Sequence, residues 1–168
     1  KLVHTRDLAL LWSISNPNTL YTTIKRYVQK GVLLPVHKGL YSTVPLTQID
    51  PVRVGIAILH TYAYISCETV LAQAGIIFQA VPAITLVTTL SKKFCVNDMQ
   101  YIARQLKPQF LYQTIGITQK DQGDGYCFAS VERAVADMLY FNKQYHFDAH
   151  AQIDWDRVTY IQKKIGYL

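Results

Sequence analysis

Polar and basic side chains between residues 16 and 41 have a spacing suited to binding a phosphate-lined groove. On a helix that starts after Asn16, one face would carry amides, hydroxyls and cations, and no carboxylate interrupts them before Gly31. Phosphates attract such a face, and its amide and guanidinium groups can bind base edges. The residues expected to contact double-stranded DNA are Asn16, Asn18, Thr19, Thr22, Thr23, Lys25, Arg26, Lys30, His37 and Lys38.

Within this set, the first turns of the helix are expected to contact the bases. The N-terminal residues of a recognition helix meet base edges, which favours Asn18, Thr19 and Thr22. Arg26 has the geometry to bind guanine through two hydrogen bonds. The alternative interpretation is a solvated helix face without a ligand, because basic helices are common on small domains.

Local signals predict the limits of this helix. Asn16 is a suitable N-cap, because its side-chain oxygen can accept from the free amides of the first turn. Pro17 fits the first helical position, and Gly31 suits the end of the helix. The apolar stripe that would face the core consists of Leu20, Ile24, Tyr27 and Val28.

Residues 32–43 predict a β-hairpin after the helix. Two apolar runs flank a turn in which Gly39 supplies the positive φ angle that short hairpins need. Pro35 favours an edge position for the first strand. His37 and Lys38 would then lie at a basic tip and contact the phosphate backbone. A helix followed by such a hairpin indicates a winged helix-turn-helix.

The residues upstream complete this pattern in part. Leu2–His4 predicts a short strand, and Arg6–Trp12 predicts a helix with Thr5 as its N-cap. The two helices would form the helix-turn-helix. A winged helix usually has one more helix in front, and we expect that helix upstream of Lys1.

The whole chain is predicted to be α+β with two domains. Residues 1–46 would form the winged helix-turn-helix, and residues 50–168 a mixed α/β domain, separated by a stretch with Pro45 and Pro51. In the second domain, Ser66 and Ser130 are expected to cap helices. The segments expected there are helices at 52–62, 67–74, 131–140 and 155–164, strands at 64–66, 83–89 and 126–129, strands with loops over 94–113, a turn at 121–125 and a loop at 144–154.

Composition and charge favour a folded protein with an anionic partner. Half of the 168 residues are apolar, which argues against disorder. The formal net charge is +6, and the first 50 residues hold six basic and two acidic side chains. The positive charge is concentrated around the predicted helix and hairpin, which favours a partner with phosphates.

The sequence indicates neither a disulfide framework nor a membrane span. Three cysteines lie far apart, which fits a reducing compartment and predicts a cytoplasmic protein. The uncharged stretch between Glu68 and Lys92 is long enough to cross a bilayer. Gly75 and Pro82 divide it, however, so we expect a buried helix followed by a buried strand.

Two enzymatic alternatives depend on metal ligands. Residue types that bind metals lie at close spacing at His146, Asp148 and His150, followed by Asp154 and Asp156. The spacing matches no standard signature, however, which favours a solvated loop. Glu132 and Asp137 could be the metal-binding carboxylates of a nuclease. They lie five residues apart on one helix, however, so they do not share a face. We therefore expect no metal, no cofactor and no enzymatic activity.

Three stretches resemble one known family in order and spacing. The stretch DLALLWSISNPNTLYTTIKRYVQKGVLLPVHKGLY is similar to the winged-helix N-terminus of the AbiEi family, and YISCETVLAQAGII and YCFASVERAVADMLY are similar to two later patterns of that family. The resemblance covers roughly Asp7 to Tyr140. AbiEi proteins are antitoxins and transcriptional regulators of bacterial abortive-infection toxin–antitoxin systems, which act in phage defence.

The resemblance implies a repressor that is also an antitoxin. The first domain would bind inverted repeats upstream of its own operon through Asn18–Arg26, His37 and Lys38. The second would counteract a nucleotidyltransferase-like toxin, with direct contact left open. Ser66, Glu68, Glu132, Arg133 and Asp137 match positions in the family patterns, without an assigned role.

A protein-interaction module remains the alternative to a DNA-binding protein. In that case the winged helix would contact a toxin or another protein, and binding would survive high salt. A nucleic-acid enzyme is a third hypothesis, and it requires a metal site.

Overall fold

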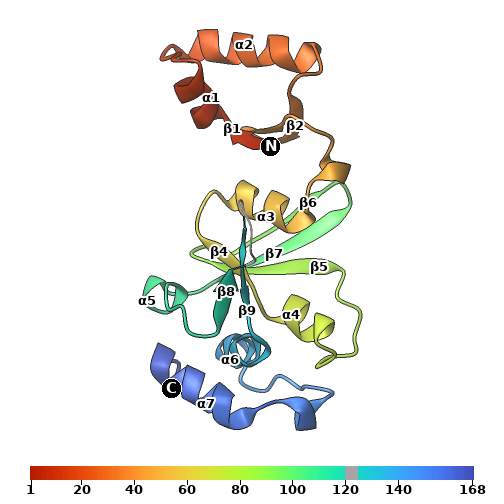
Figure 1. Cartoon of the computed structure of the whole chain (residues 1–168), viewed down its shortest axis with the longest axis vertical. Coiled ribbons are helices and arrows are strands. Elements are labelled where there is room, and N and C mark those ends of the chain that lie inside the picture. The colour runs from red at the N-terminus through yellow and green to blue at the C-terminus, as the bar shows by residue number, and fades with distance from the viewer. Residues whose placement is uncertain (120–124) are drawn as a thin grey trace. The chain divides into compact units, whose positions relative to one another are not determined.

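The computed structural model describes residues 1–119 and 125–168, which form α-helices and two β-sheets (Figure 1). The predicted α+β class is confirmed. Of the predicted turn at 121–125, residues 121–124 lie outside the described residues. The chain divides into two units, Lys1–His60 and Thr61–Leu168, and each is described here by itself. The predicted domain limits, 1–46 and 50–168, stay a prediction.

The first unit consists of two helices, a small sheet and a third helix. A three-stranded antiparallel sheet has the order β1-β3-β2, so the strand before the helices pairs with the second strand of the hairpin. The elements are β1 (Leu2–His4), α1 (Thr5–Leu11), α2 (Pro17–Gln29), β2 (Leu34–His37), β3 (Leu40–Ser42), a 3-10 turn at Leu46–Gln48 and α3 (Pro51–Leu59).

Helix α2 has the predicted start. The Asn16 side chain accepts from the backbone amides of Asn18 and Thr19, at 2.9 and 3.3 Å, and Pro17 is the first helical residue. Lys30 is the C-cap, and Gly31 follows with φ +70°. These contacts satisfy backbone groups that a helix end otherwise leaves unpaired.

The core of this unit joins α1, α2 and the start of the hairpin. Leu8, Leu20, Ile24 and Leu33 are buried, and each contributes on the order of 1.5–3 kcal/mol of transfer free energy. Trp12 stacks on Tyr27 with ring centroids 5.1 Å apart. The predicted apolar stripe of α2 therefore faces this core, with Tyr27 at its exposed margin.

The hairpin is attached to the start of α1. Gly39 has φ +76°, and its carbonyl accepts from the Thr5 amide at 2.9 Å and from the Thr5 hydroxyl at 3.2 Å. The prediction that Thr5 caps α1 is wrong, because Thr5 is the first helical residue and His4 is the N-cap. Pro35 lies in β2, an edge strand as predicted.

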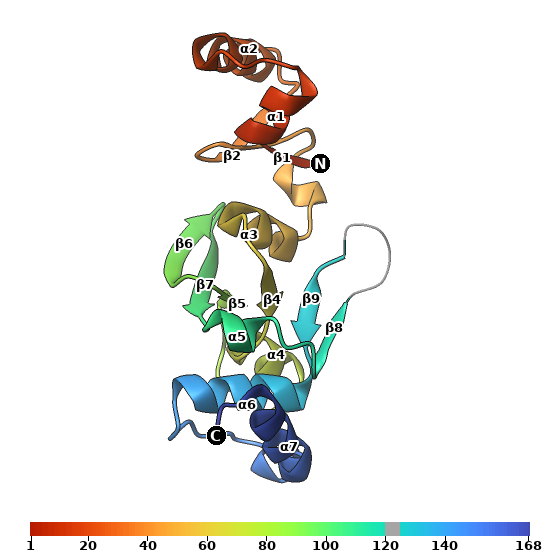
Figure 2. The ribbon, with the colours of Figure 1, turned by 90° about the vertical axis from the view of Figure 1, so that its left-hand side faces the viewer.

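The second unit is built on a mixed six-stranded sheet. Its order is β6-β7-β5-β4-β9-β8, in which β5 and β7 are parallel, as are β4 and β9. Helix α6 packs against both α4 and α7 (Figure 2). The elements are β4 (Ala63–Ile65), α4 (Glu68–Gln73), β5 (Ala83–Thr88), β6 (Lys92–Val96), β7 (Met99–Gln105), α5 (Pro108–Leu111), β8 (Ile117–Gln119), β9 (Cys127–Ala129), α6 (Val131–Phe141), a 3-10 turn at His150–Gln152 and α7 (Trp155–Ile165).

Most predicted segments of the second unit are confirmed within a few residues, with two corrections. Ser130 caps α6, accepting from the Arg133 amide, as predicted. Ser66 does not cap α4, because Cys67 is the N-cap and the Ser66 hydroxyl is used elsewhere. Pro108 opens the short helix α5 rather than a loop. Among the described helices, none is both long and apolar enough to cross a membrane.

Candidate nucleic-acid interface

The polar face of α2 is exposed and carries three cationic side chains. Lys25, Arg26 and Lys30 are exposed, and within the described residues no carboxylate forms a salt bridge with them. Asn18, Thr19 and Thr22 are exposed on the same helix, whereas Thr23 is half-buried. A cationic face that the fold leaves unpaired can attract an anionic ligand.

Three of the predicted contact residues already bond within α2. The Asn16 side-chain oxygen accepts two backbone amides, so its capping role uses that acceptor. The Thr22 hydroxyl donates to the Asn18 carbonyl at 2.8 Å, and the Thr23 hydroxyl donates to the Thr19 carbonyl at 2.8 Å. These bonds use the Asn16 side-chain oxygen and the two hydroxyl protons. They leave the Asn16 amide group, the acceptor lone pairs of the threonine oxygens and the threonine methyl groups to contact a ligand.

Both acidic side chains of the first unit accept hydrogen bonds from backbone amides where helices begin. Asp7 accepts from the His4 amide at 3.0 Å, and Asp50 accepts from the Val52 amide at 2.9 Å. The unit holds seven basic and two acidic side chains, a formal net charge of +5 with histidines neutral, against +1 for residues 61–168. The surplus charge is therefore concentrated in the unit that contains α2.

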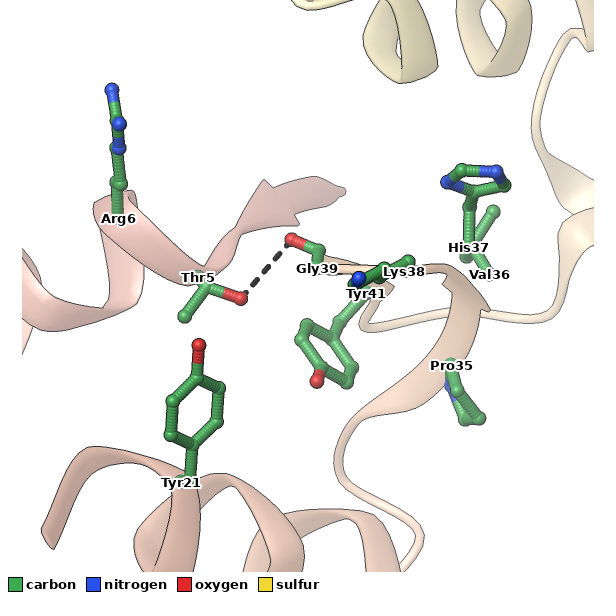
Figure 3. A pocket seen from close by; sticks show the side chains of 9 residues that line it. All are labelled: Thr5, Arg6, Tyr21, Pro35, Val36, His37, Lys38, Gly39 and Tyr41. Carbon is green, nitrogen blue, oxygen red and sulfur yellow. Dashed lines mark hydrogen bonds between the residues drawn. The ribbon is translucent and has the colours of Figure 1, made fainter. Parts of the chain in front are cut away.

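An open groove of about 950 Å³ lies between the helices and the hairpin (Figure 3). Tyr21 enters it from α2, and His37 and Lys38 are exposed at the turn of the hairpin. Figure 3 shows the Tyr21 ring directed toward Thr5, where α1 begins. The lining residues are Thr5, Arg6, Tyr21, Pro35, Val36, His37, Lys38, Gly39 and Tyr41.

Arg6 and Tyr21 are groove residues that sequence reasoning missed. Tyr21 is 60% exposed although it is aromatic, and Arg6 is exposed. A signal for Tyr21 was available, because it does not share the helical spacing of the buried Leu20 and Ile24. No comparable signal marked Arg6, whose place in the groove depends on the hairpin folding back toward α1.

Three of the motif residues in the second unit meet in its interior. The Arg133 Nε donates to the Asp137 carboxylate at 2.9 Å, and both side chains are fully buried. Ser66 and Tyr64 donate to the other carboxylate oxygen at 2.7 and 3.0 Å. The Tyr167 hydroxyl, from the residue next to the C-terminus, also donates to Asp137.

The remaining N–H groups of Arg133 are also satisfied. Its Nη1 donates to the carbonyls of Gln113 and Ile115, each at 3.0 Å, and its Nη2 donates to the Tyr64 hydroxyl at 2.9 Å. A Cβ atom on Gly116 would lie 2.8 Å from the Arg133 Cβ, so a glycine is needed for this close approach. A buried network with every member paired is typical of a structural role.

Electrostatics within this network agree with that role. Burial raises the pKa of Tyr64 and of Tyr167, and the Asp137 charge raises both further. Burial alone would lower the pKa of Arg133, but the Asp137 carboxylate and the tyrosine hydroxyls raise it above its usual range. Near neutral pH the two tyrosines therefore stay neutral and the arginine stays charged.

The other two motif residues lie outside the network. Glu68 forms a salt bridge with Arg104 and accepts from the Thr85 hydroxyl at 3.2 Å. Glu132 accepts from the Ser130 hydroxyl at 2.9 Å, at the start of α6. Both carboxylates lie in first helical turns, where they complement the helix dipole.

The candidate metal ligands do not converge. His146 and Asp148 approach to 4.0 Å, while Asp148 accepts from the Phe78 amide at 2.7 Å. The His150 ring stacks on Trp155. In the described part of the chain, no three histidine, cysteine or acidic side chains are placed to hold a metal ion.

Comparison with known protein families and with curated proteins finds no match to this chain.

Proposed function

We propose that the chain is a sequence-specific DNA-binding repressor with a winged helix-turn-helix at residues 1–46. The exposed, carboxylate-free face of α2 carries this proposal. In the proposal, α2 is the recognition helix and lies in the major groove. The protein would act in the cytoplasm.

The order and pairing of the first elements support this assignment. A strand, two helices and a hairpin follow one another, and β1 joins the hairpin to make the sheet β1-β3-β2. The hydrogen bonds from Thr5 to Gly39 fix the hairpin turn relative to the helix pair. A helix and a hairpin tip held on one frame could contact bases and backbone together.

The proposed contacts separate into two kinds. Asn18, Thr19, Thr22 and Arg26 would contact base edges, since they lie on the first three turns of α2. Cationic or imidazole side chains of α1, α2 and the hairpin would contact phosphates and set the position of the protein without selecting sequence. The proposed phosphate contacts are Arg6, Lys25, Lys30, His37 and Lys38.

We further propose that the repressor is the antitoxin of an AbiE-like toxin–antitoxin system and autoregulates its operon. The support is the resemblance of three stretches to the AbiEi family. In the second unit, the Ser66, Arg133 and Asp137 positions of that resemblance form the buried network. This network would hold β4 and α6 in a fixed arrangement, so any surface that counteracts a nucleotidyltransferase-like toxin lies elsewhere.

The test is binding to the DNA upstream of the gene against a scrambled duplex, measured by fluorescence anisotropy across a salt series. We expect preference for the upstream DNA and a steep loss of affinity with salt, because each phosphate contact releases counterions. A matched control is Lys163→Ala, an exposed lysine on α7, which should not change binding. Equal and weak binding to both duplexes would contradict the proposal.

A protein partner is the second candidate. Leu10 and Leu11 on α1 are 80% and 74% exposed, and together they form an apolar surface on this helix. If the first unit contacts a toxin through this surface, pull-down with the toxin would persist at high salt and fail for Leu10→Ser with Leu11→Ser. DNA binding would then be weak and non-specific.

A further inference from the structure

Helix α2 contains two neighbouring threonines with the same hydrogen bond and different exposure. Each hydroxyl donates to the carbonyl four residues earlier at 2.8 Å, from Thr22 to Asn18 and from Thr23 to Thr19. Such a bond holds the side chain in one rotamer, since threonine is already restricted about χ1. Because the hydroxyl proton is used, the side chain can contact a ligand in two ways: its oxygen can accept a hydrogen bond, or its Cγ2 methyl group, whose direction the rotamer fixes, can make an apolar contact.

The two methyl groups differ in what they can reach. Thr22 is exposed between Asn18 and Arg26, each one helical turn away on the same face. Thr23 is half-buried and lies toward the apolar side. In the major groove, thymine is distinguished by its C5 methyl group, against which a threonine methyl can pack.

We infer that Thr22 selects a thymine through contact between its Cγ2 methyl and the thymine C5 methyl. The inference rests on the proposed function, because it requires α2 to enter the major groove. Thr22 and Arg26 are about 6 Å apart along the helix axis. The thymine therefore lies within about two base pairs of the guanine that Arg26 would bind, given a rise of about 3.4 Å per base pair.

The probe is a set of duplexes enriched from a randomised library by the wild-type chain. Each thymine of the enriched sequence is then replaced singly by deoxyuridine, which lacks the C5 methyl group. We expect about fourfold weaker binding at one position, the loss expected for one buried methyl group. For Thr22→Ser, which keeps the hydroxyl bond but lacks the methyl, the same replacement should have little effect.

Thr23→Ser is the matched control, because it removes the same group from a threonine with the same backbone bond. The inference takes Thr23 out of the contact set, since its side chain is half-buried toward the apolar side of α2. This variant should retain the fourfold deoxyuridine effect. The inference is overturned if every deoxyuridine is neutral for the wild type, if the enriched sequence lacks thymine, or if Thr22→Ser retains the effect. Failure to enrich any sequence would instead contradict the proposed function.

Discussion

Helices α2 and α6 both carry charged side chains, but the fold treats these charges in opposite ways. On α6, Arg133 and Asp137 are fully buried and every polar group of the pair has a partner. On α2, Arg26 is exposed, and among the described residues no carboxylate pairs with it. A charge that the fold has fully paired stabilises the fold, whereas an unpaired surface charge remains available to a ligand.

The largest effect should come from removing one member of the buried pair. Asp137→Ala leaves the Arg133 guanidinium buried without its counter-charge, which should cost about 3–5 kcal/mol of unfolding free energy. Urea unfolding of the second unit can be followed by Trp155 fluorescence in a Trp12→Phe background. Asp156→Asn, on an exposed aspartate of α7, is the control and should cost less than about 1 kcal/mol. Equal losses of unfolding free energy in both variants would contradict the view that the buried charge stabilises the fold more than the exposed one.

The converse change on α2 should affect binding and leave stability intact. Arg26→Ala should lower affinity for the preferred DNA by about 1–3 kcal/mol and relax sequence choice, while Lys38→Ala should weaken all duplexes about equally. Unfolding free energies should stay within about 0.5 kcal/mol of wild type. Arg157→Ala, at an exposed position of α7, is the matched control. Wild-type binding by both variants would contradict the roles assigned to α2 and the hairpin.

Removing the Tyr167 hydroxyl from the buried network should have a smaller effect on stability. Tyr167→Phe removes one hydrogen bond to Asp137 and keeps the ring, so about 1 kcal/mol of unfolding free energy should be lost. Tyr160→Phe, at a residue that is 45% exposed, should change little. Equal stability of Tyr167→Phe and wild type would show that the Tyr167 hydroxyl contributes nothing to the buried pair.

The smallest effect concerns pH and the first unit. Burial lowers the pKa of His4, and the His60 ring, whose centroid is 4.0 Å away, lowers it further. The unfolded chain therefore binds a proton at His4 more readily, so stability is fully present above about pH 6.5 and declines as the pH falls below it. Unfolding followed by Trp12 fluorescence in a Trp155→Phe background would measure the decline. His4→Phe should reduce it, and His37→Gln, at an exposed position, should not.

Features with local causes were predictable from the sequence. The start of α2 follows from Asn16 and Pro17, because a cap and a first-turn proline act within three residues. The edge position of β2 follows from Pro35, since proline cannot donate to a neighbouring strand. The exposure of Arg26 and Lys25 follows from the helical period, which directs the apolar stripe inward.

Features that join distant segments were not predictable in this way. Ser66 had a plausible local role as a helix cap, but its hydroxyl bonds to Asp137, 71 residues later. Arg6 and Tyr21 line the groove beside α2 only because the hairpin folds back and bonds to Thr5 through Gly39. Sequence spacing contains no information about such pairs without the path of the chain between them.

The sequence by itself determined the helix, its cap, its apolar stripe and the surplus of positive charge in the first sixty residues. Only the tertiary structure decided which charges are paired within the protein: Arg133 pairs with Asp137, whereas Arg26 has no carboxylate partner among the residues that the structure describes. The physical reason is that propensity and period act over a few residues, whereas desolvation and pairing of a charge depend on everything packed around it.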